Sequence, residues 1–526
     1  MQEAEPPGLT GPPRRKALGL GGAALIVSGS VLVSRLLGLL RETILAALLG
    51  VTAEGDLYRY AFLIPDLINY LLAGGFLSIT LIPLLARRVE AGDEKGLWAD
   101  FGTVFRFVGL AILGITAAMM ILAEPLARLL FPALEPPDLD AVVRLTRIVL
   151  PAQVFFVSGS LFMAAQYVQR RFLIPALAPV VYNLAIIGGG LLGAAVGEAS
   201  PDAFIWGALA GAGVGSFALQ WWGAHRVGLR WIRTRTPILS EYLTLALPLM
   251  VGQSVAVLDE QFPRLFGQAV GPGAASSLSL ARMLNMLAVG MIAQAAAVAS
   301  FPFLARLVAG ANEAEADRVT IRSLRTTVAA ALFASALFWA ASGPLVRIAY
   351  QRGAFDEAAS EVVAGLVAIF ALSIPAWGIH QIIVRWFYAH RRMWLPVLIG
   401  TGATVVAIPA TLLAADRWGA AGIAGASTAV MWVYTGAMAL AWFANASSRR
   451  LSLLDALARG IVPAVAAALA GKWVSQQLSF DSVGMAVLTA AITGAVVVIV
   501  FVALARLFRF AEANPKEWRR KAPDPV

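Results

Sequence analysis

The chain contains no cysteine, only three histidines and few charged residues for its length. Without cysteine it can form no disulfide bond, thiolate nucleophile or cysteine-ligated metal site. The histidines, His225, His380 and His390, are far apart in the sequence, so no zinc-binding spacing is present. Charged residues make up 14% of the 526 residues, whereas a soluble globular chain carries roughly 25%. A soluble domain with an ordinary charged surface is therefore not expected.

Hydrophobic residues amount to 59% of the chain and form fourteen runs between polar breaks. A membrane helix needs about 20 mostly apolar residues, and these runs are long enough to supply one each. The predicted spans are 20–48, 57–86, 97–123, 141–168, 174–196, 203–224, 240–262, 276–305, 324–343, 361–388, 394–415, 420–443, 454–471 and 483–508. The sequence thus predicts an all-α, polytopic membrane protein of about 14 transmembrane helices.

The distribution of basic residues predicts the orientation in the cytoplasmic (inner) membrane. Most of the 41 Lys and Arg residues fall in alternate segments between spans and in the two tails, and such segments stay in the cytoplasm. Both termini are therefore expected to be cytoplasmic, with disordered or polar tails at 1–18 and 511–526. The formal charge of +10 is divided into short clusters between apolar runs, so a nucleic-acid partner is not expected. The N-terminal segment does not have the pattern of a cleavable signal peptide.

The chain repeats itself at an offset near 220 residues. IPLLARRVEAG at 82–92 resembles FPFLARLVAG at 301–310, and QYVQRRFLIPAL at 166–177 resembles WFYAHRRMWLPVL at 386–398. Six spans separate the copies, so both halves have the same orientation, and a site is expected at their interface. The predicted organisation is an N-lobe of helices 1–6 (19–238), a C-lobe of helices 7–12 (239–448), and helices 13–14 (449–510).

Two arginines, Arg35 and Arg282, lie away from the ends of apolar spans, where a charge is costly and usually marks function. Arg35 belongs to SRLLGLLRE at 34–42, which also carries Arg41 and Glu42, and Arg282 belongs to SSLSLARMLNML in the eighth span. Guanidinium groups offer planar pairs of donors that match phosphate oxygens. A substrate with phosphate groups is therefore indicated, although Arg35 and Glu42 could instead form a structural pair.

Two acidic residues of the second span belong to the same candidate site. Asp56 lies at the start of that helix and is expected either to cap it or to pair with Arg41. Asp66 follows Pro65, and we hypothesise that it pairs with Arg59, seven residues earlier, or with Arg41 until a substrate anion displaces it. No phosphate-binding G-x-x-x-x-G-K-[ST] loop and no nucleophile paired with histidine is visible, so the chain is not expected to be an enzyme.

Several segments together resemble the MurJ/MviN lipid II flippase family, part of the multidrug, oligosaccharidyl-lipid and polysaccharide exporter group. The resemblance extends over helices 1–12. The matching segments are SRLLGLLRE with Asp56 downstream, IPDL with AGGFLS and IP (Ile64 to Pro83), QRRFLIPALAP with Asn183, SLARML around Arg282, YQRGAF (350–355) and RWFYAHRRMWLP (385–396).

The resemblance implies two six-helix lobes and two further helices that form a lipid-facing groove. It implies lipid II as substrate, an undecaprenyl pyrophosphate that carries the peptidoglycan disaccharide-pentapeptide. The residues that it implies to be essential are Arg35, Arg41, Glu42 (an Asp in many relatives), Asp56 and Arg282.

The sequence departs from the family in two places. Many relatives have an Arg pair and an acidic residue where Asn69, Tyr70 and Gly74 stand, and helix 394–415 lacks the Asn and Asp of a sodium site. We therefore expect no cofactor, no metal site and no sodium coupling, with membrane potential as the driving force.

The expected partners are lipid II, membrane lipids and proteins of cell-wall synthesis. Two alternatives stay open at this point. One is a related exporter of other lipid-linked sugars or of drugs, and the other is a non-transporting scaffold for the cell-wall machinery.

Overall fold

The computed structural model describes residues 20–69, 76–197, 199–232, 236–254, 258–294, 304–444, 447–478 and 482–510, and every regular element in those ranges is helical. The predicted tails, together with Tyr70 and Gly74, lie outside the described residues. The elements are α1 (Leu20–Leu49), α2 (Ala53–Ala61), α3 (Leu63–Ile68), α4 (Phe76–Glu90), α5 (Glu94–Leu130), α6 (Pro136–Val149), α7 (Ala152–Val168), α8 (Leu173–Ala195), α9 (Pro201–Gly211), η2 (Ala212–Ala218), α10 (Leu219–Arg226), α11 (Ile238–Ser254), α12 (Leu258–Gly267), α13 (Ala274–Val289), η3 (Gly290–Gln294), α15 (Glu313–Ala340), α16 (Ser342–Tyr350), α17 (Glu357–Ala371), α18 (Ile374–Ala389), α19 (Trp394–Phe443), α20 (Ser447–Gln477) and α21 (Val483–Leu507).

The helices fall on the predicted spans. Nine helical stretches of the described chain are long and apolar enough to cross a membrane, and the pair α17 and α18, bent by 41°, makes a tenth. The stretch α19 holds two predicted spans, because Gly419 interrupts it with a φ of 57°. The remaining three spans coincide with α1, with α2 to α4, and with α11 and α12. The predicted all-α, polytopic fold is thereby confirmed, and the helices accommodate the predicted count of about fourteen spans.

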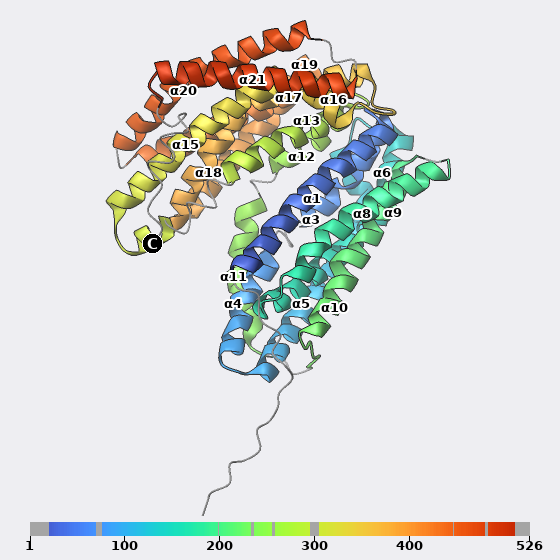
Figure 1. The fold of residues 1–526 in the computed structure, drawn as a ribbon. Helices are drawn as coiled ribbons and strands as arrows, with labels where there is room; N and C mark the ends of the chain where they lie inside the picture. Colours follow the sequence, from blue (N-terminus) through green and yellow to red (C-terminus); the bar gives the residue numbers. More distant parts are fainter. Residues whose placement is uncertain are drawn as a thin grey trace, which may run out of the picture.

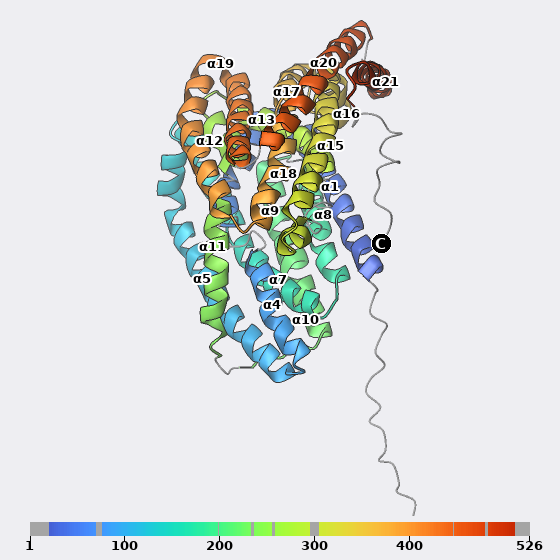
Figure 2. The same ribbon diagram turned by 90° about the vertical axis from the view of Figure 1, so that its left-hand side faces the viewer.

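The helices form two lobes that meet at one end and separate toward the other (Figure 1). Elements α1 to α10 make the N-lobe, and α12 to α19 make the C-lobe. We call the end near α6 and α16 the converging end, and the end that carries α4, α10, α15 and α18 the diverging end. Figure 2 shows α20 and α21 on the outside of the C-lobe, where they pack against α15 and α16. The predicted arrangement of two lobes and two additional helices is confirmed.

The internal repeat is also present in the turns that connect the helices. Gly92 and Ala311 both have positive φ values, 68° and 54°. The next residue in each turn caps the following helix: Asp93 accepts from the N–H of Gly96, and Asn312 accepts from the N–H of Glu315.

In a second pair of turns, the two members also share one backbone conformation. Arg170 has a φ of 56° and Arg391 a φ of 58°. Each donates its N–H to the carbonyl three residues earlier, Tyr167 in the N-lobe and Tyr388 in the C-lobe. Equal backbone geometry at sequence-related positions is not expected of chance similarity between apolar segments, so the parallel repeat is real.

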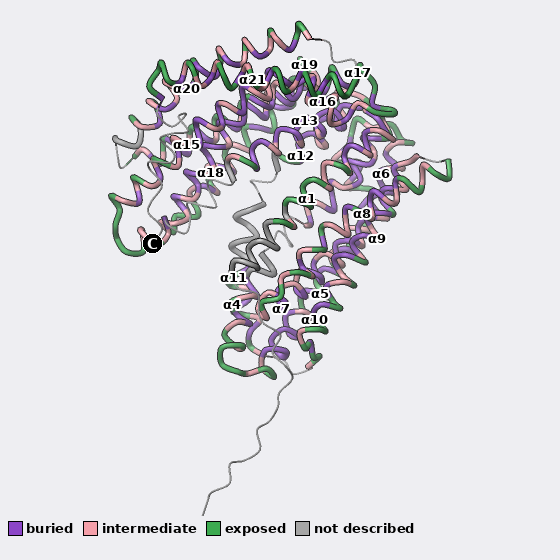
Figure 3. The backbone as a smooth tube through the Cα atoms, in the orientation of Figure 1, coloured by how far each residue is buried: buried purple, intermediate pink, exposed green. Residues whose placement is uncertain are grey.

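Each lobe has a hydrophobic core of its own. Trp98, Phe101 and Phe162 are buried in the N-lobe, whereas Phe387 and Trp442 are buried in the C-lobe. Figure 3 shows that the buried segments of both lobes lie where helices face one another. Each lobe can therefore move as a packed unit relative to the other.

The first half of α11 packs against the N-lobe, although the predicted C-lobe begins at residue 239. Tyr242 and Ala246 join the N-lobe core, and Glu241 forms an ion pair with Arg87 of α4 at 2.6 Å. The following helix, α12, packs on α13 and α19 of the C-lobe. The exact lobe boundary stays a prediction, and the connection between the lobes passes through α11.

Candidate functional site

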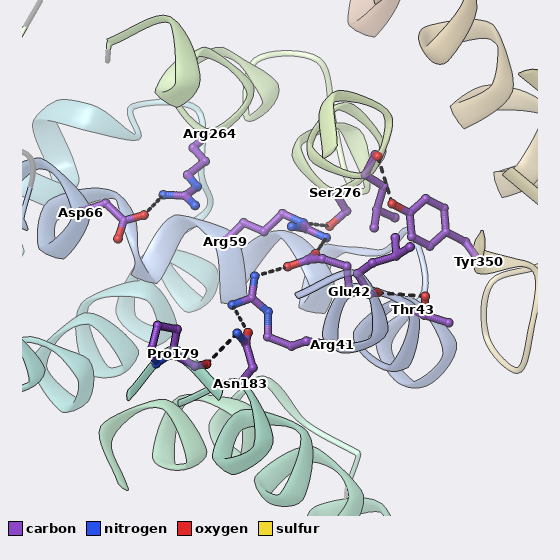
Figure 4. Close-up of polar contacts among 12 residues, drawn as sticks. Arg41, Glu42, Thr43, Arg59, Asp66, Pro179, Asn183, Arg264, Ser276 and Tyr350 are labelled. Carbon is purple, nitrogen blue, oxygen red and sulfur yellow. Dashed lines mark hydrogen bonds and ion pairs between the residues drawn. The ribbon is translucent and has the colours of Figure 1, made fainter. Parts of the chain in front are cut away.

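A network of charged side chains joins the two lobes at the converging end (Figure 4). Its centre is Glu42 of α1, which is 5% exposed. One carboxylate oxygen accepts from Nη2 of Arg41 at 2.7 Å, and the other accepts from Nη2 of Arg59 at 3.1 Å. A buried carboxylate is stable only when it is paired, and Glu42 has two arginines. The pairing holds both guanidinium groups at the junction between α1 and α2.

Arg41 is also tied to α8. Its Nη1 donates to the side-chain oxygen of Asn183 at 3.3 Å. The amide nitrogen of Asn183 donates to the carbonyl of Pro179, which turns the amide oxygen toward Arg41. Nε of Arg41 is buried and has no partner among the described residues. The predicted binding residue Arg41 is thus held by two N-lobe helices with one donor unused.

Two side chains of α2 reach into the C-lobe. Nε of Arg59 donates to the hydroxyl of Ser276 at 3.3 Å. The carboxylate of Asp56 accepts from the N–H groups of Gly273 at 2.7 Å and Ser276 at 2.6 Å. The first N–H groups of a helix lack partners within it and carry partial positive charge. Asp56 therefore caps α13 of the opposite lobe.

The position of Asp56 corrects the sequence-based interpretation, which had it cap its own helix or pair with Arg41. The N-cap of α2 is Thr52, whose side chain accepts from the N–H of Gly55 at 3.4 Å. Because that cap is already made, the carboxylate of Asp56, one turn further on, extends across the lobe junction.

Asp56→Asn is expected to open the converging end. Asparagine has only one acceptor oxygen, so one N–H of α13 loses its partner and the favourable charge at the helix start disappears. We expect a cysteine placed at Ala275, which is fully buried, to react with a thiol reagent about tenfold faster in this variant. Asp356→Asn is the matched control, because Asp356 caps α17 within its own lobe. The role of Asp56 would be contradicted if Ala275→Cys were labelled at the same rate alone, with Asp56→Asn and with Asp356→Asn.

Backbone contacts bring the lobes together around the same network. The hydroxyl of Thr43 donates to the carbonyl of Ala349 at 2.8 Å, and the N–H of Ala354 donates to the carbonyl of Ala47 at 2.8 Å. A Cβ on Gly353 would lie 2.3 Å from the carbonyl oxygen of Ala47, so only glycine allows this approach. The YQRGAF segment, singled out by the family resemblance, thus docks on the end of α1.

Gln268, which follows α12 of the C-lobe, holds the end of α5. Its amide nitrogen donates to the carbonyl of Leu130 at 2.5 Å, and its amide oxygen accepts from the N–H of Ala133 at 3.2 Å. The converging end is therefore closed by side-chain and backbone contacts on several helices of both lobes.

The second predicted span breaks before Asp66, as Pro65 requires. Proline has no N–H, so the carbonyl of Ala61, four residues earlier, loses its helical partner. The hydroxyl of Thr146 donates to that carbonyl at 3.2 Å. The break separates α2 from α3 at Phe62.

Asp66 pairs with Arg264 of α12 at 2.5 Å, and the same Nη1 of Arg264 also contacts Gln261. The hypothesised partners Arg59 and Arg41 are both taken by Glu42, so that assignment was wrong. A helix break lies between positions 59 and 66, and the argument from a shared helix face does not apply across it. Figure 4 shows the Asp66 pair beside the Glu42 network as a second charged link between the lobes.

Arg35 and Arg282 lie further toward the diverging end. Arg35 is exposed on α1, and its Nη1 is so close to η3, which continues α13, that a Cβ on Gly290 would lie 2.3 Å away. Arg282 is buried in α13 and donates to the hydroxyl of Ser427 on α19 at 3.4 Å. The structure thus brings Arg41, Glu42, Asp56 and Asp66 together, and places Arg35 and Arg282 along the same two facing helices.

Sequence reasoning did not identify Arg264 or Ser276, and it considered Arg59 only as a partner for Asp66. A signal for Arg264 was available, because it is the only basic residue of LDEQFPRLFG at 258–267 and faces the cost of any cation in a membrane helix. Ser276 offered no such signal, since a serine near a helix start is common.

An apolar groove lies on the outer side of the C-lobe, between α15, α19 and α20. Its volume is about 420 Å³. It is lined by Leu332, Ser335, Ala336, Trp339, Leu372, Pro375, Trp432, Ile461, Ala464, Val465, Ala468 and Leu469. A groove of this composition suits a hydrocarbon chain.

Known proteins of one family match most of the chain. A family model described as lipid II flippase MurJ matches residues 45–492. A Rhizobium meliloti protein named probable lipid II flippase MurJ is 29% identical over 421 residues, which are 77% of each chain. A Burkholderia cenocepacia protein named lipid II flippase MurJ is 29% identical over 397 residues, 73% of this chain and 76% of its own.

Solved transporters have a similar fold. A structure titled lipid II flippase MurJ, inward closed conformation, superposes with a TM-score of 0.76 at 18% identity, over 93% of this chain and 100% of that one. An inward-facing multidrug resistance transporter of the MATE family superposes with a TM-score of 0.67 at 14% identity, over 82% of this chain and 98% of that one.

Proposed function

This chain belongs to the MurJ family of lipid II flippases, and on that premise we propose that it moves lipid II from the inner to the outer leaflet of the cytoplasmic membrane by alternating access. The chain carries out no covalent step of its own in this proposal. Proteins that make or use lipid II in cell-wall synthesis are the proposed protein partners.

The observation that carries the proposal is the row of arginines along the lobe junction. Arg41, Arg59 and Arg264 are each paired with a carboxylate, and Arg35 lies exposed nearer the diverging end. Diphosphate oxygens accept from guanidinium groups in the same geometry as a carboxylate does. A lipid diphosphate can therefore take the place of Glu42 or Asp66 at these arginines.

The charged links also suggest how binding is coupled to movement. Asp66 and Arg264 hold α3 to α12, and Arg59, one of the two partners of Glu42, reaches Ser276 of the C-lobe. When the diphosphate competes for these arginines, the links between the lobes weaken at the converging end. The converging end then opens, and the head group leaves on the side of the membrane that this end had closed.

The proposed orientation places both termini and the diverging end in the cytoplasm. The structure is then an inward-facing state, in which the converging end closes the outer side. The driving force is membrane potential, since one elementary charge moved across 100 mV releases about 2.3 kcal/mol. Neither a sodium ion nor a cofactor has a part in this scheme. The polyprenyl tail stays in the membrane and lies in the apolar groove beside α20.

Growth of cells depleted of their own lipid II flippase tests the proposal. Cells that express this chain should keep growing and should keep translocating lipid II. An inserted, folded chain that supports neither would overturn the proposed function.

Orientation has a direct test in a chain without cysteine. An impermeant thiol reagent should not label Arg230→Cys in intact cells, because the 226–238 connection is cytoplasmic in the proposal. Glu135→Cys, in the connection between α5 and α6, is the control and should be labelled. Labelling of position 230 in intact cells would reverse the topology.

Asp66→Asn is expected to keep transport and to increase the affinity for the lipid diphosphate. The substitution removes the anion that competes for Arg264. Binding of lipid II in detergent at fixed salt measures the effect. If binding is unchanged or weaker, Asp66 does not compete with the substrate and serves only to hold α3 in place.

A further inference from the structure

Three of the four non-glycine residues with positive φ in the described chain are arginines. Arg170, Arg391 and Arg509 have φ values of 56°, 58° and 53° and follow the ends of α7, α18 and α21. In each turn the N–H of the arginine bonds to the carbonyl three residues earlier, and the next N–H bonds to the carbonyl five residues earlier. This is the Schellman ending, in which the left-handed position usually holds glycine.

The left-handed backbone conformation does not explain why arginine stands at these positions. A side chain with a Cβ destabilises the left-handed conformation relative to glycine. A cation does stabilise the negative end of a helix, but it does so equally well from the last helical turn, where φ is ordinary. The strain at Arg170 and Arg391 therefore points to another use of the side chain, repeated in both lobes.

The side chains around the two repeat-related turns are exposed. The guanidinium groups form no hydrogen bond or ion pair with the described residues, neither those of Arg170 and Arg171 in the N-lobe nor those of Arg391 and Arg392 in the C-lobe. Exposed apolar side chains lie within two residues of each arginine pair: Leu173 is 56% exposed, and Met393 and Trp394 are 51% and 61% exposed. Each turn thus presents two guanidinium groups beside an apolar surface.

We propose that the turns at 170–173 and 391–394 each bind the headgroup of an anionic glycerophospholipid. Two arginines bind the lipid phosphate, while the apolar residues that follow contact its acyl chains. Charge complementarity supports this occupant, because clustered arginines at a membrane surface attract anionic lipids. The depth is also suitable, since arginine and tryptophan side chains favour the interface between headgroups and hydrocarbon.

The arrangement provides one lipid site on each lobe. Both turns lie at the diverging end, where the lobes are furthest apart, so the two sites move relative to each other when the lobes close. The lipid thereby anchors each lobe separately in its leaflet, independently of the substrate site.

The chain without cysteine allows each site to be probed alone. Leu173→Cys and Met393→Cys would each carry a fluorophore, and the full chain would be reconstituted in phosphatidylcholine bilayers. Quenching by brominated phosphatidylglycerol is compared with quenching by brominated phosphatidylcholine. We expect phosphatidylglycerol to be preferred at both positions, by roughly fivefold for each arginine that binds and less at high salt.

The two lobes serve as controls for each other. R170Q/R171Q should remove the preference at position 173 and leave it unchanged at position 393, and R391Q/R392Q should do the reverse. Equal quenching by both lipids in the parent chain, or a preference that survives these substitutions, would overturn the proposal.

A stability measurement separates lipid binding from a purely structural role. R170G should raise the apparent melting temperature in detergent, because glycine relieves the strain, yet it should lower the phosphatidylglycerol preference. Ala311→Gly is the matched control, because Ala311 has the same backbone without a cation, so it should raise stability and leave lipid preference unchanged. A lower melting temperature in R170G would mean that the arginine stabilises the fold, and the proposal would fail.

Discussion

Replacing Arg35 or Arg282 by alanine is expected to leave the chain inserted and folded but unable to support growth of cells depleted of their own lipid II flippase. Each position is a guanidinium within a membrane span, on one of the two helices that face each other across the lobe junction. Lysine should restore activity only in part, because it keeps the charge but loses the planar pair of donors.

Arg147→Ala is the matched control for this experiment. Arg147 also lies in a predicted span, but it is exposed on the N-lobe, where its Nε bonds to the carbonyl of Met120. This variant should support growth. Size-exclusion chromatography of all three alanine variants establishes that they are folded. Full growth with both Arg35→Ala and Arg282→Ala would remove these residues from the proposed site.

Arg59→Ala is expected to have the largest effect on stability. Arg59 and Glu42 are each 5% exposed and form an ion pair at 3.1 Å. Truncating one member of a buried pair costs about 3–5 kcal/mol when the other charge is left without a partner. Glu42 keeps its ion pair with Arg41 at 2.7 Å, so we expect a loss below that range. The apparent melting temperature and the denaturant midpoint of the purified protein should both fall.

The double variant Arg59→Gln/Glu42→Gln separates the cost of an unpaired charge from the loss of packing. It should recover part of the stability, because neither glutamine carries a charge, but not all of it, because Arg41 loses its carboxylate partner. Arg128→Ala is the control, because Arg128 pairs with Glu124 on the surface, where such a pair contributes little. Additive effects of the two single substitutions would show that Arg59 and Glu42 are not coupled.

The spans and the repeat could be predicted from the sequence because both depend on local patterns. A run of apolar residues determines that a helix crosses the membrane. The polar and proline residues that match between the two halves indicate the duplication from the sequence alone. Some helices extend beyond the spans: α15, which holds the span predicted at 324–343, begins at Glu313 and ends at Ala340, after which α16 starts separately.

The pairings within the site could not be predicted, because they depend on how the two lobes are placed. Asp66 was assigned to an arginine on its own helix, whereas its partner, Arg264, is 198 residues away. Asp56 was expected to act locally, yet it caps a helix more than 200 residues later. Sequence identified these residues as costly in a membrane and therefore in need of partners, but only the fold determines which partners they find.

The contact between Gln268 and the end of α5 provides a pivot at the converging end for the N-lobe, in whose core α5 is packed. With 37 residues, α5 is about 55 Å long, so a rotation of about 10° around its held end moves the far end by about 10 Å. Such a rotation moves the far end of the N-lobe by about the width of a helix and unfolds neither lobe. For a given rotation, the displacement of the far end is proportional to the length of α5. Shortening α5 by whole turns would therefore reduce the displacement in proportion.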